Sequence, residues 1–299
     1  KIEASVLNQE ALKNDLIAQV KSVYYELWYL KSKQKILQQQ DSIFERFQYA
    51  ANLRFKTGES NALEQATANA ELADIQIAIK ENASGIKDLQ LQLQNLINSK
   101  SLVDINVGDL EAKTAMSSGV SKDSLEVSNN PLVSYYKSKV EIADKERSVE
   151  SAKMLPDITV GYFNQSFIGN GETANGSPTV FDSGDRFSGV QLGLSIPIFF
   201  KSHSAKIKAA KIHKLESESQ LELIKNHTQA QLQIALASLN KDEQNLDFYR
   251  LNALPQAALL LKNSQRGFQE GEIEYVEYVQ GLNRALTIQT KYLAFVNQY

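Results

Sequence analysis

Residues 186–200 read RFSGVQLGLSIPIFF and alternate apolar residues with small or polar ones. Successive side chains of a β-strand point to opposite faces of the sheet, so this alternation predicts a strand with two unlike faces. The apolar face would carry Val190, Leu192, Leu194 and Ile196. The opposite face would carry Gln191, Gly193 and Ser195.

A second strand is predicted in LPDITVGYFNQSFI, residues 155–168. The polar residues 169–185 between the two strands form a flexible loop that is too long for a tight hairpin turn. Two interpretations fit: a small hairpin packed on helices, or a hairpin of an outer-membrane β-barrel, which alternates in this way. Two strands alone cannot cross a bilayer because their edges leave N–H and C=O groups unpaired in lipid. Other strands would then come from other subunits or from a further segment.

Most of the remaining sequence predicts long helices. Residues 3–55 contain no Gly and no Pro and repeat apolar residues every seven positions, which is a coiled-coil pattern about 80 Å long. A second helix is predicted to begin at an Asn61–Glu64 capping box and to end near Asn98. Further helices are predicted over 131–154, over 202–265 with a kink at Pro255, and from the Gly271 turn to Tyr299.

One turn motif occurs twice, in RFKTGESNALEQ from Arg54 and in RGFQEGEIEYVEYVQ from Arg266. Such a repeat indicates internal duplication, with each motif at the end of one helical hairpin. The aligned glycines, Gly58 and Gly271, are expected to adopt a left-handed backbone after a helix. The motifs also place four carboxylates in the first turns of helices, where the helix dipole favours them: Glu59, Glu64, Glu272 and Glu277.

The composition excludes several classes of function. A net charge of −3 offers no basic footprint for nucleic acid, and the lack of cysteine excludes disulfides and thiolate metal sites. His203, His213 and His227 are spaced 10 and 14 residues apart on one predicted helix and should not converge on a metal. No catalytic motif and no cofactor-binding motif is found, so we expect neither an enzyme nor a bound cofactor. Since Lys1 is not an initiator methionine, the chain is expected to begin inside a longer protein.

These segments, taken in order, resemble the TolC-type outer-membrane efflux proteins over almost the whole chain. MLPDITVGYFNQ is similar to the family's helix-to-strand entry, and FSGVQLGLSIPIFF to the strand that leaves the barrel. The two repeated turns look like the periplasmic tips, and YYEL at Tyr24 and ALPQA at Ala253 also fit. Within the family, the sequence is closest to the TolC-like region of Czc/Cus-type heavy-metal systems, which in some bacteria is fused to the C-terminus of the pump.

The resemblance implies a mainly α-helical fold with a β-hairpin, in a trimer located in the bacterial outer membrane and periplasm. Coiled-coil hairpins would form a periplasmic α-barrel, and each subunit would add strands to a 12-stranded β-barrel. The tip residues, Gly58, Glu59, Glu64, Gly271, Glu272 and Glu277, would dock a periplasmic adaptor that joins the duct to an inner-membrane pump of the resistance–nodulation–division (RND) class. Gln191, Gly193 and Ser195 would line the barrel lumen, while the apolar face would contact lipid. Heavy-metal cations would be the exported cargo.

The implied organisation has one departure from the family, since the first helix and the first strand pair are missing. The segments expected are a first helical hairpin (1–98), a connector (99–130), a helix leading to the barrel (131–155), a strand pair (156–198) with its external loop (169–185), and a second helical hairpin (199–299). A soluble coiled-coil scaffold or an adaptor-like protein is the alternative. Adaptors need flanking β-domains with many short strands, and the sequence does not predict these.

Overall fold

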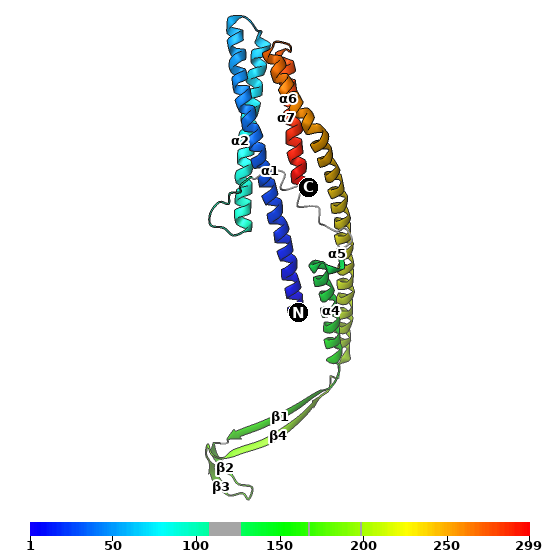
Figure 1. Ribbon diagram of the computed structural model, residues 1–299. Coiled ribbons are helices and arrows are strands. Elements are labelled where there is room, and N and C mark those ends of the chain that lie inside the picture. The colour runs from blue at the N-terminus through cyan, green and yellow to red at the C-terminus, as the bar shows by residue number, and fades with distance from the viewer. Residues whose placement is uncertain (108–126, 167, 198) are drawn as a thin grey trace. The chain divides into compact units, whose positions relative to one another are not determined.

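The computed structural model describes residues 1–107, 127–166, 168–197 and 199–299 (Figure 1). Most of the predicted connector, residues 108–126, lies outside the described residues. The chain divides into two units, which we describe separately. Unit 1 comprises residues 1–8 and 128–226, and unit 2 comprises residues 9–127 and 227–299.

The predicted long helices are present. Two of them, α1 (Ile2–Thr57) and α5 (Phe200–Phe248), contribute residues to both units. Unit 2 also contains α2 (Ala62–Leu96), α6 (Leu254–Gln269) and α7 (Tyr275–Gln298). Unit 1 contains a short 3-10 turn (Val127–Asn129, of which Val127 belongs to unit 2), followed by α4 (Pro131–Ala152), in which Asn130 caps the first turn and Pro131 begins the helix.

The core of unit 2 is organised around α7, which packs against α1 and α2. Near the turns, one apolar cluster joins the three helices: Phe44, Phe47, Ala51, Ala68, Ile75, Tyr275, Tyr278, Val279, Leu282 and Leu286. Towards the C-terminus, a second cluster joins them to α5 and the residues after α2: Leu27, Trp28, Leu93, Ile105, Leu246, Leu293 and Val296. The heptad residues of α7 therefore bury two separate cores, as a coiled-coil seam does.

The two repeated turns have the same backbone geometry. Gly58 has φ +77° and Gly271 has φ +74°, so both adopt the predicted left-handed conformation. Glu59 N donates to Arg54 O at 2.8 Å, and Glu272 N donates to Gly267 O at 2.7 Å. These are the six-to-one bonds of a Schellman motif, which satisfy carbonyl groups at the end of a helix.

The capping of the following helices differs from the prediction. Asn61 Oδ1 accepts from Glu64 N at 2.9 Å, but the Glu64 carboxylate pairs with Arg54 at 2.8 Å instead of returning to Asn61. The reciprocal capping box is found in the second turn, between Glu274 and Glu277. This capping box was not predicted from the sequence, because glutamate is a less common N-cap than asparagine or serine.

The predicted interruption at Pro255 takes a specific form. A π-helical turn, Tyr249–Ala253, separates α5 from α6, and Pro255 lies in the first turn of α6. Proline has no N–H to donate to the carbonyl four residues earlier, and a wider turn accommodates that loss.

Unit 1 pairs α4 with the first part of α5, and Lys214 Nζ donates to Asp144 Oδ1 at 2.8 Å. This bond lowers the pKa of the Asp144 carboxyl group. After α4 the chain forms β1 (Asp157–Ser166), which pairs antiparallel with β4 (Arg186–Ser195). The segment 169–185, predicted as a flexible loop, contains β2 (Gly169–Glu172) and β3 (Pro178–Phe181), which form a second small hairpin. The strands were not predicted because glycine and asparagine, which occur in this hairpin, have a low propensity for β-structure.

Small residues set the distance between α6 and α7. A Cβ atom added at Gly281 would lie 2.0 Å from Ser264 Oγ and 3.0 Å from Ser264 Cβ. We therefore expect Gly281→Ala to lower the free energy of unfolding by about 1 to 2 kcal/mol through overpacking. Thermal or denaturant unfolding of the detergent-solubilised protein measures this. Adding Ser264→Gly should recover most of the loss, and simple additivity of the two changes would contradict this contact.

The backbone at Gly271 gives a second prediction, since an added Cβ would meet no atom within 4 Å there. Gly271→Ala should still cost about 1 to 2 kcal/mol because a left-handed backbone strains alanine. Gly271→Asn should cost less, since asparagine tolerates that conformation better. Equal losses for alanine and asparagine would show that the backbone is not the cause.

Candidate functional site

The β1–β4 hairpin has one continuous apolar face. The register pairs Ile158 with Leu194, Val160 with Leu192 and Tyr162 with Val190. Directly paired residues of an antiparallel sheet share a face, so these six side chains form one band. The other face carries the pairs Thr159–Gly193, Gly161–Gln191 and Asp157–Ser195, which are small or polar. The predicted alternation is therefore present in both strands.

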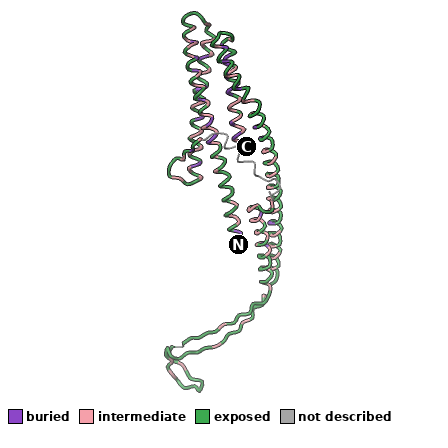
Figure 2. Tube along the Cα trace, in the orientation of Figure 1, coloured by how far each residue is buried: buried purple, intermediate pink, exposed green. Residues whose placement is uncertain are grey.

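No part of the described chain covers the apolar band, and most of the hairpin is exposed, with the remainder intermediate, in Figure 2. The exposed fractions of the four predicted lipid-facing residues are 71% for Val190, 77% for Leu192, 66% for Leu194 and 56% for Ile196. Each long strand also pairs with only one neighbour within the described residues, which leaves its outer edge open. An apolar face with open edges on both sides needs both an apolar environment and further strands.

The polar face includes one aromatic contact that the sequence analysis missed. Phe163 pairs with Gly189, and a Cβ atom at Gly189 would lie 2.7 Å from the Phe163 ring. The ring therefore lies over the glycine, which leaves no room for a larger residue at that position. A glycine opposite an aromatic residue is the sequence signal for this arrangement.

The two repeated turns meet at one end of unit 2, as Figure 1 shows, and enclose a groove of about 730 Å³. We call it the tip groove. Residues of both turns line it: Arg54, Gly58, Glu59, Ser60, Asn61, Leu63, Glu64, Thr67, Phe268, Gly271, Ile273, Glu274, Tyr275 and Val276. Four of the six predicted tip residues therefore line the groove: Gly58, Glu59, Glu64 and Gly271. Glu272 and Glu277 do not line it.

The four predicted tip carboxylates have different environments. Glu64 is paired with Arg54, and the Glu277 carboxylate accepts from Glu274 N at 3.2 Å. Glu59 and Glu272 are exposed, and neither makes an ion pair with any other described residue. Glu59 and Glu272 are therefore free to meet a solute or a partner.

An aromatic stack beside the two turns joins α1, α6 and α7, and two of its members, Phe268 and Tyr275, also line the groove. The Phe47 ring lies 4.3 Å from that of Tyr275 and 5.4 Å from that of Tyr278, and the Tyr278 ring lies 4.8 Å from that of Phe268. Sequence periodicity had identified the helices but not this contact between residues over 200 positions apart. Burial raises the pKa of both tyrosines, so their hydroxyls stay protonated.

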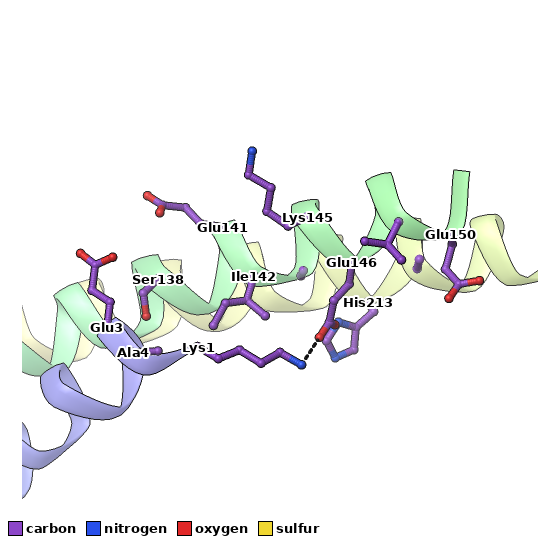
Figure 3. A pocket seen from close by; sticks show the side chains of 13 residues that line it. Lys1, Glu3, Ala4, Ser138, Glu141, Ile142, Lys145, Glu146, Glu150 and His213 are labelled. Atoms are coloured by element: carbon purple, nitrogen blue, oxygen red, sulfur yellow. Dashed lines mark ion pairs between the residues drawn. The ribbon is translucent and has the colours of Figure 1, made fainter. Parts of the chain in front are cut away.

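A second hollow, of about 780 Å³, lies in unit 1 beside the start of α1 (Figure 3). Lys1 extends across it and pairs with Glu146 at 2.9 Å, next to His213. Glu141 and Lys145 project away from Lys1 in the same view. His213 is one of the three histidines from the sequence analysis. Among the described residues, no three His, Asp or Glu side chains are grouped so that they could hold a metal ion.

No helix of the described chain is both long and apolar enough to cross a bilayer.

A family model described as outer membrane efflux protein matches residues 124–299. A comparison with curated proteins found no match. Among solved structures, the chain is similar to CusC with a TM-score of 0.80 and 16% identity, covering 99% of this chain and 69% of CusC. A membrane protein from Pseudomonas aeruginosa gives a TM-score of 0.79 and 16% identity, with 99% and 68% covered. The outer membrane channel CmeC of Campylobacter jejuni gives 0.77 and 14%, with 99% and 62% covered.

The long helices, the exposed strand pair and the fold of these channels agree with one another. The family match covers residues 124–299, which is 176 of the 299 residues and more than half of the chain. The chain therefore belongs to the outer membrane efflux protein family and is an efflux-channel component of the outer membrane and periplasm.

Proposed function

We propose that this protein is a passive, trimeric exit duct of a tripartite efflux system. The proposal rests on the uncovered apolar band of β1 and β4, which includes the paired residues Ile158 and Leu194. In a barrel, this band faces hydrocarbon and the small polar face, with Gln191, Gly193 and Ser195, lines the lumen. The energy for export would come from the inner-membrane pump, because the duct itself only conducts.

The open strand edges support assembly from several copies. A transmembrane sheet must close on itself so that every backbone group is paired. Neighbouring copies of the protein supply strands that pair with the outer edges of β1 and β4. In this proposal the helical hairpins formed by residues 1–98 and 199–299 build the periplasmic α-barrel, and residues 131–155 connect it to the strands.

The tip groove is the proposed docking surface for a periplasmic adaptor, which links the duct to an RND-class pump. Three features support it: the groove has contributions from both repeated turns, Leu63 and Val276 expose apolar surface there, and Glu59 is free to pair. A concave surface with apolar contacts and a few polar groups suits the insertion of a helical hairpin.

The proposed cargo is a heavy-metal cation. Support comes from the resemblance to Czc/Cus-type systems, from the similarity of fold to CusC, and from the two free carboxylates at the tips, Glu59 and Glu272. Threefold symmetry would arrange these carboxylates in rings, and acidic rings favour the passage of cations.

Arginine substitutions at adjacent positions of β4 test the orientation of the hairpin. Leu192→Arg should reduce the amount of trimer in the outer membrane, because a lipid-facing arginine costs about 2 to 4 kcal/mol at the bilayer midplane. Gln191→Arg should assemble normally and lower the conductance for cations. Membrane fractionation and planar-bilayer recording measure both effects. If Leu192→Arg assembled normally and Gln191→Arg did not, the lipid-facing and lumen-facing sides of β4 would be the reverse of those proposed.

Neutral substitutions at the tips test the cation preference. Glu59→Gln and Glu272→Gln together should reduce the permeability ratio of K⁺ to Cl⁻ while leaving the melting temperature unchanged, since both groups are exposed. Glu64→Gln is the matched control and should lower stability more than selectivity, because Glu64 already pairs with Arg54. Unchanged selectivity in the double variant would argue against an acidic ring.

A further inference from the structure

A block of lysines follows the strand pair directly. After β4 the chain has no carboxylate until Glu216, and five lysines precede that residue: Lys201, Lys206, Lys208, Lys211 and Lys214. The whole chain has a net charge of −3, so this block does not follow from its composition. A local excess of positive charge indicates a negatively charged partner.

The lysines begin at the end of α5 where the helix dipole disfavours them. The N-terminal end of a helix carries partial positive charge, which favours carboxylates and other anions over ammonium groups. The chain follows this rule in α2 and α7, which have Glu64 and Glu277 in their first turns. The first turn of α5 instead contains Lys201 and no acidic residue. Departures from such local rules are expected at functional sites.

Two of the five lysines meet carboxylates within unit 1. Lys214 Nζ donates to Asp144 Oδ1 at 2.8 Å. The Glu150 carboxylate accepts from Lys153 of α4, which lowers its pKa, and the nearby Lys206 lowers that pKa further. Lys206 and Lys214 therefore stabilise the packing of α5 against α4.

The other three lysines, Lys201, Lys208 and Lys211, have no such role. Their spacing of seven and three residues places them on one face of α5. All three are exposed, and none of them makes an ion pair with any other described residue. Their ammonium groups are accessible, so an external anion can reach them without any rearrangement of the fold.

The position of these lysines along the chain indicates which anion they meet. Asp157 and Ser195 form the last pair of β1 and β4, at the end where the strands join α4 and α5 (Figure 1). Three apolar side chains near that end are exposed: Leu155, Phe199 and Phe200, with Phe199 at 86%. Apolar strand, aromatic residues and then lysines is the order in which side chains pass from the hydrocarbon of a bilayer to its phosphate groups.

We propose that Lys201 and Lys208, with a smaller contribution from Lys211, bind the phosphate groups of an anionic phospholipid at the periplasmic boundary of the outer membrane. The inference rests on the membrane-inserted duct proposed above and adds the class of lipid that it binds.

The dimensions of a bilayer and of a helix give the three lysines different weights. The headgroup layer is about 5 to 7 Å thick, so Lys201 lies within it. Lys208 is about 10 Å further along α5, and its flexible side chain reaches back towards the layer. Lys211 is about 15 Å along and contributes least. A headgroup with net negative charge, such as that of phosphatidylglycerol, suits these lysines better than a zwitterionic one.

The first part of the test titrates lipid into the full-length protein in a neutral detergent. A lipid that binds the folded protein raises its melting temperature, and the dependence on lipid concentration gives an apparent Kd. The wild type should bind phosphatidylglycerol at least tenfold more tightly than phosphatidylcholine at about 50 mM NaCl. At about 500 mM NaCl the preference should fall below threefold, because salt screens exposed charges.

The second part removes the lysines. Lys201→Gln together with Lys208→Gln should weaken the binding of phosphatidylglycerol at least tenfold, since each lysine near an anionic surface contributes about fivefold. Lys211→Gln alone should weaken it less than Lys201→Gln alone. The double variant should still insert into the outer membrane and conduct, because the strands are unchanged.

A second double variant, Lys137→Gln with Lys225→Gln, is the matched control. It removes the same charge from α4 and α5, and both residues are exposed and make no ion pair with any other described residue. They lie more than about 20 Å along their helices from the strands, well outside the headgroup layer. This control should change the binding of phosphatidylglycerol less than twofold.

The outcomes separate this inference from the proposed duct. A wild type without preference for phosphatidylglycerol, or a Lys201→Gln, Lys208→Gln variant that keeps the preference, would overturn the inference and leave the duct intact. Equal stabilisation by inorganic phosphate at the same concentration would assign the lysines to free phosphate and overturn the lipid site. Binding of neither lipid would overturn the membrane placement of the hairpin together with the inference.

Discussion

A pair of antiparallel strands with a bare apolar face and two open edges is stable neither in water nor alone in lipid, and this constraint governs the protein. In water, the apolar side chains of the band, which include those of Ile158 and Leu194, would be exposed to solvent. In a bilayer, the unpaired backbone N–H and C=O groups at the outer edges of β1 and β4 would be exposed to lipid. Closure of a barrel by several copies satisfies both requirements at once. The proposed assembly from several copies and the location in the outer membrane would thus have one physical cause.

The helices of unit 2 hold the two repeated turns side by side. The seam of α7 buries two cores against its neighbours, and the near-contact of Gly281 with Ser264 brings α6 close to α7. The stack of Phe47 on Tyr275 then fixes the second turn against the first. The groove between the turns is consequently built by rigid elements, which suits a docking surface.

Much of the fold could be predicted from the sequence, because periodicity reports which side of an element is apolar. Heptads identified the long helices, and alternation identified both faces of the strand pair. The short strands β2 and β3 were missed, since glycine and asparagine carry little strand signal. At the tips, the repeated motif located the glycines and glutamates. The stacking of Phe47 on Tyr275 could not be predicted, because it depends on packing between residues far apart in the sequence.

The orientation of β4 is the central claim, and spin labels attached singly at residues 190 to 195 of the reconstituted protein test it most directly. Collision rates with oxygen, which concentrates in lipid, and with a water-soluble nickel chelate would be measured at each position. The account predicts a period of two, with oxygen favoured at Val190, Leu192 and Leu194 and nickel favoured at Gln191, Gly193 and Ser195. Equal access to nickel at all six positions, or the opposite alternation, would contradict it.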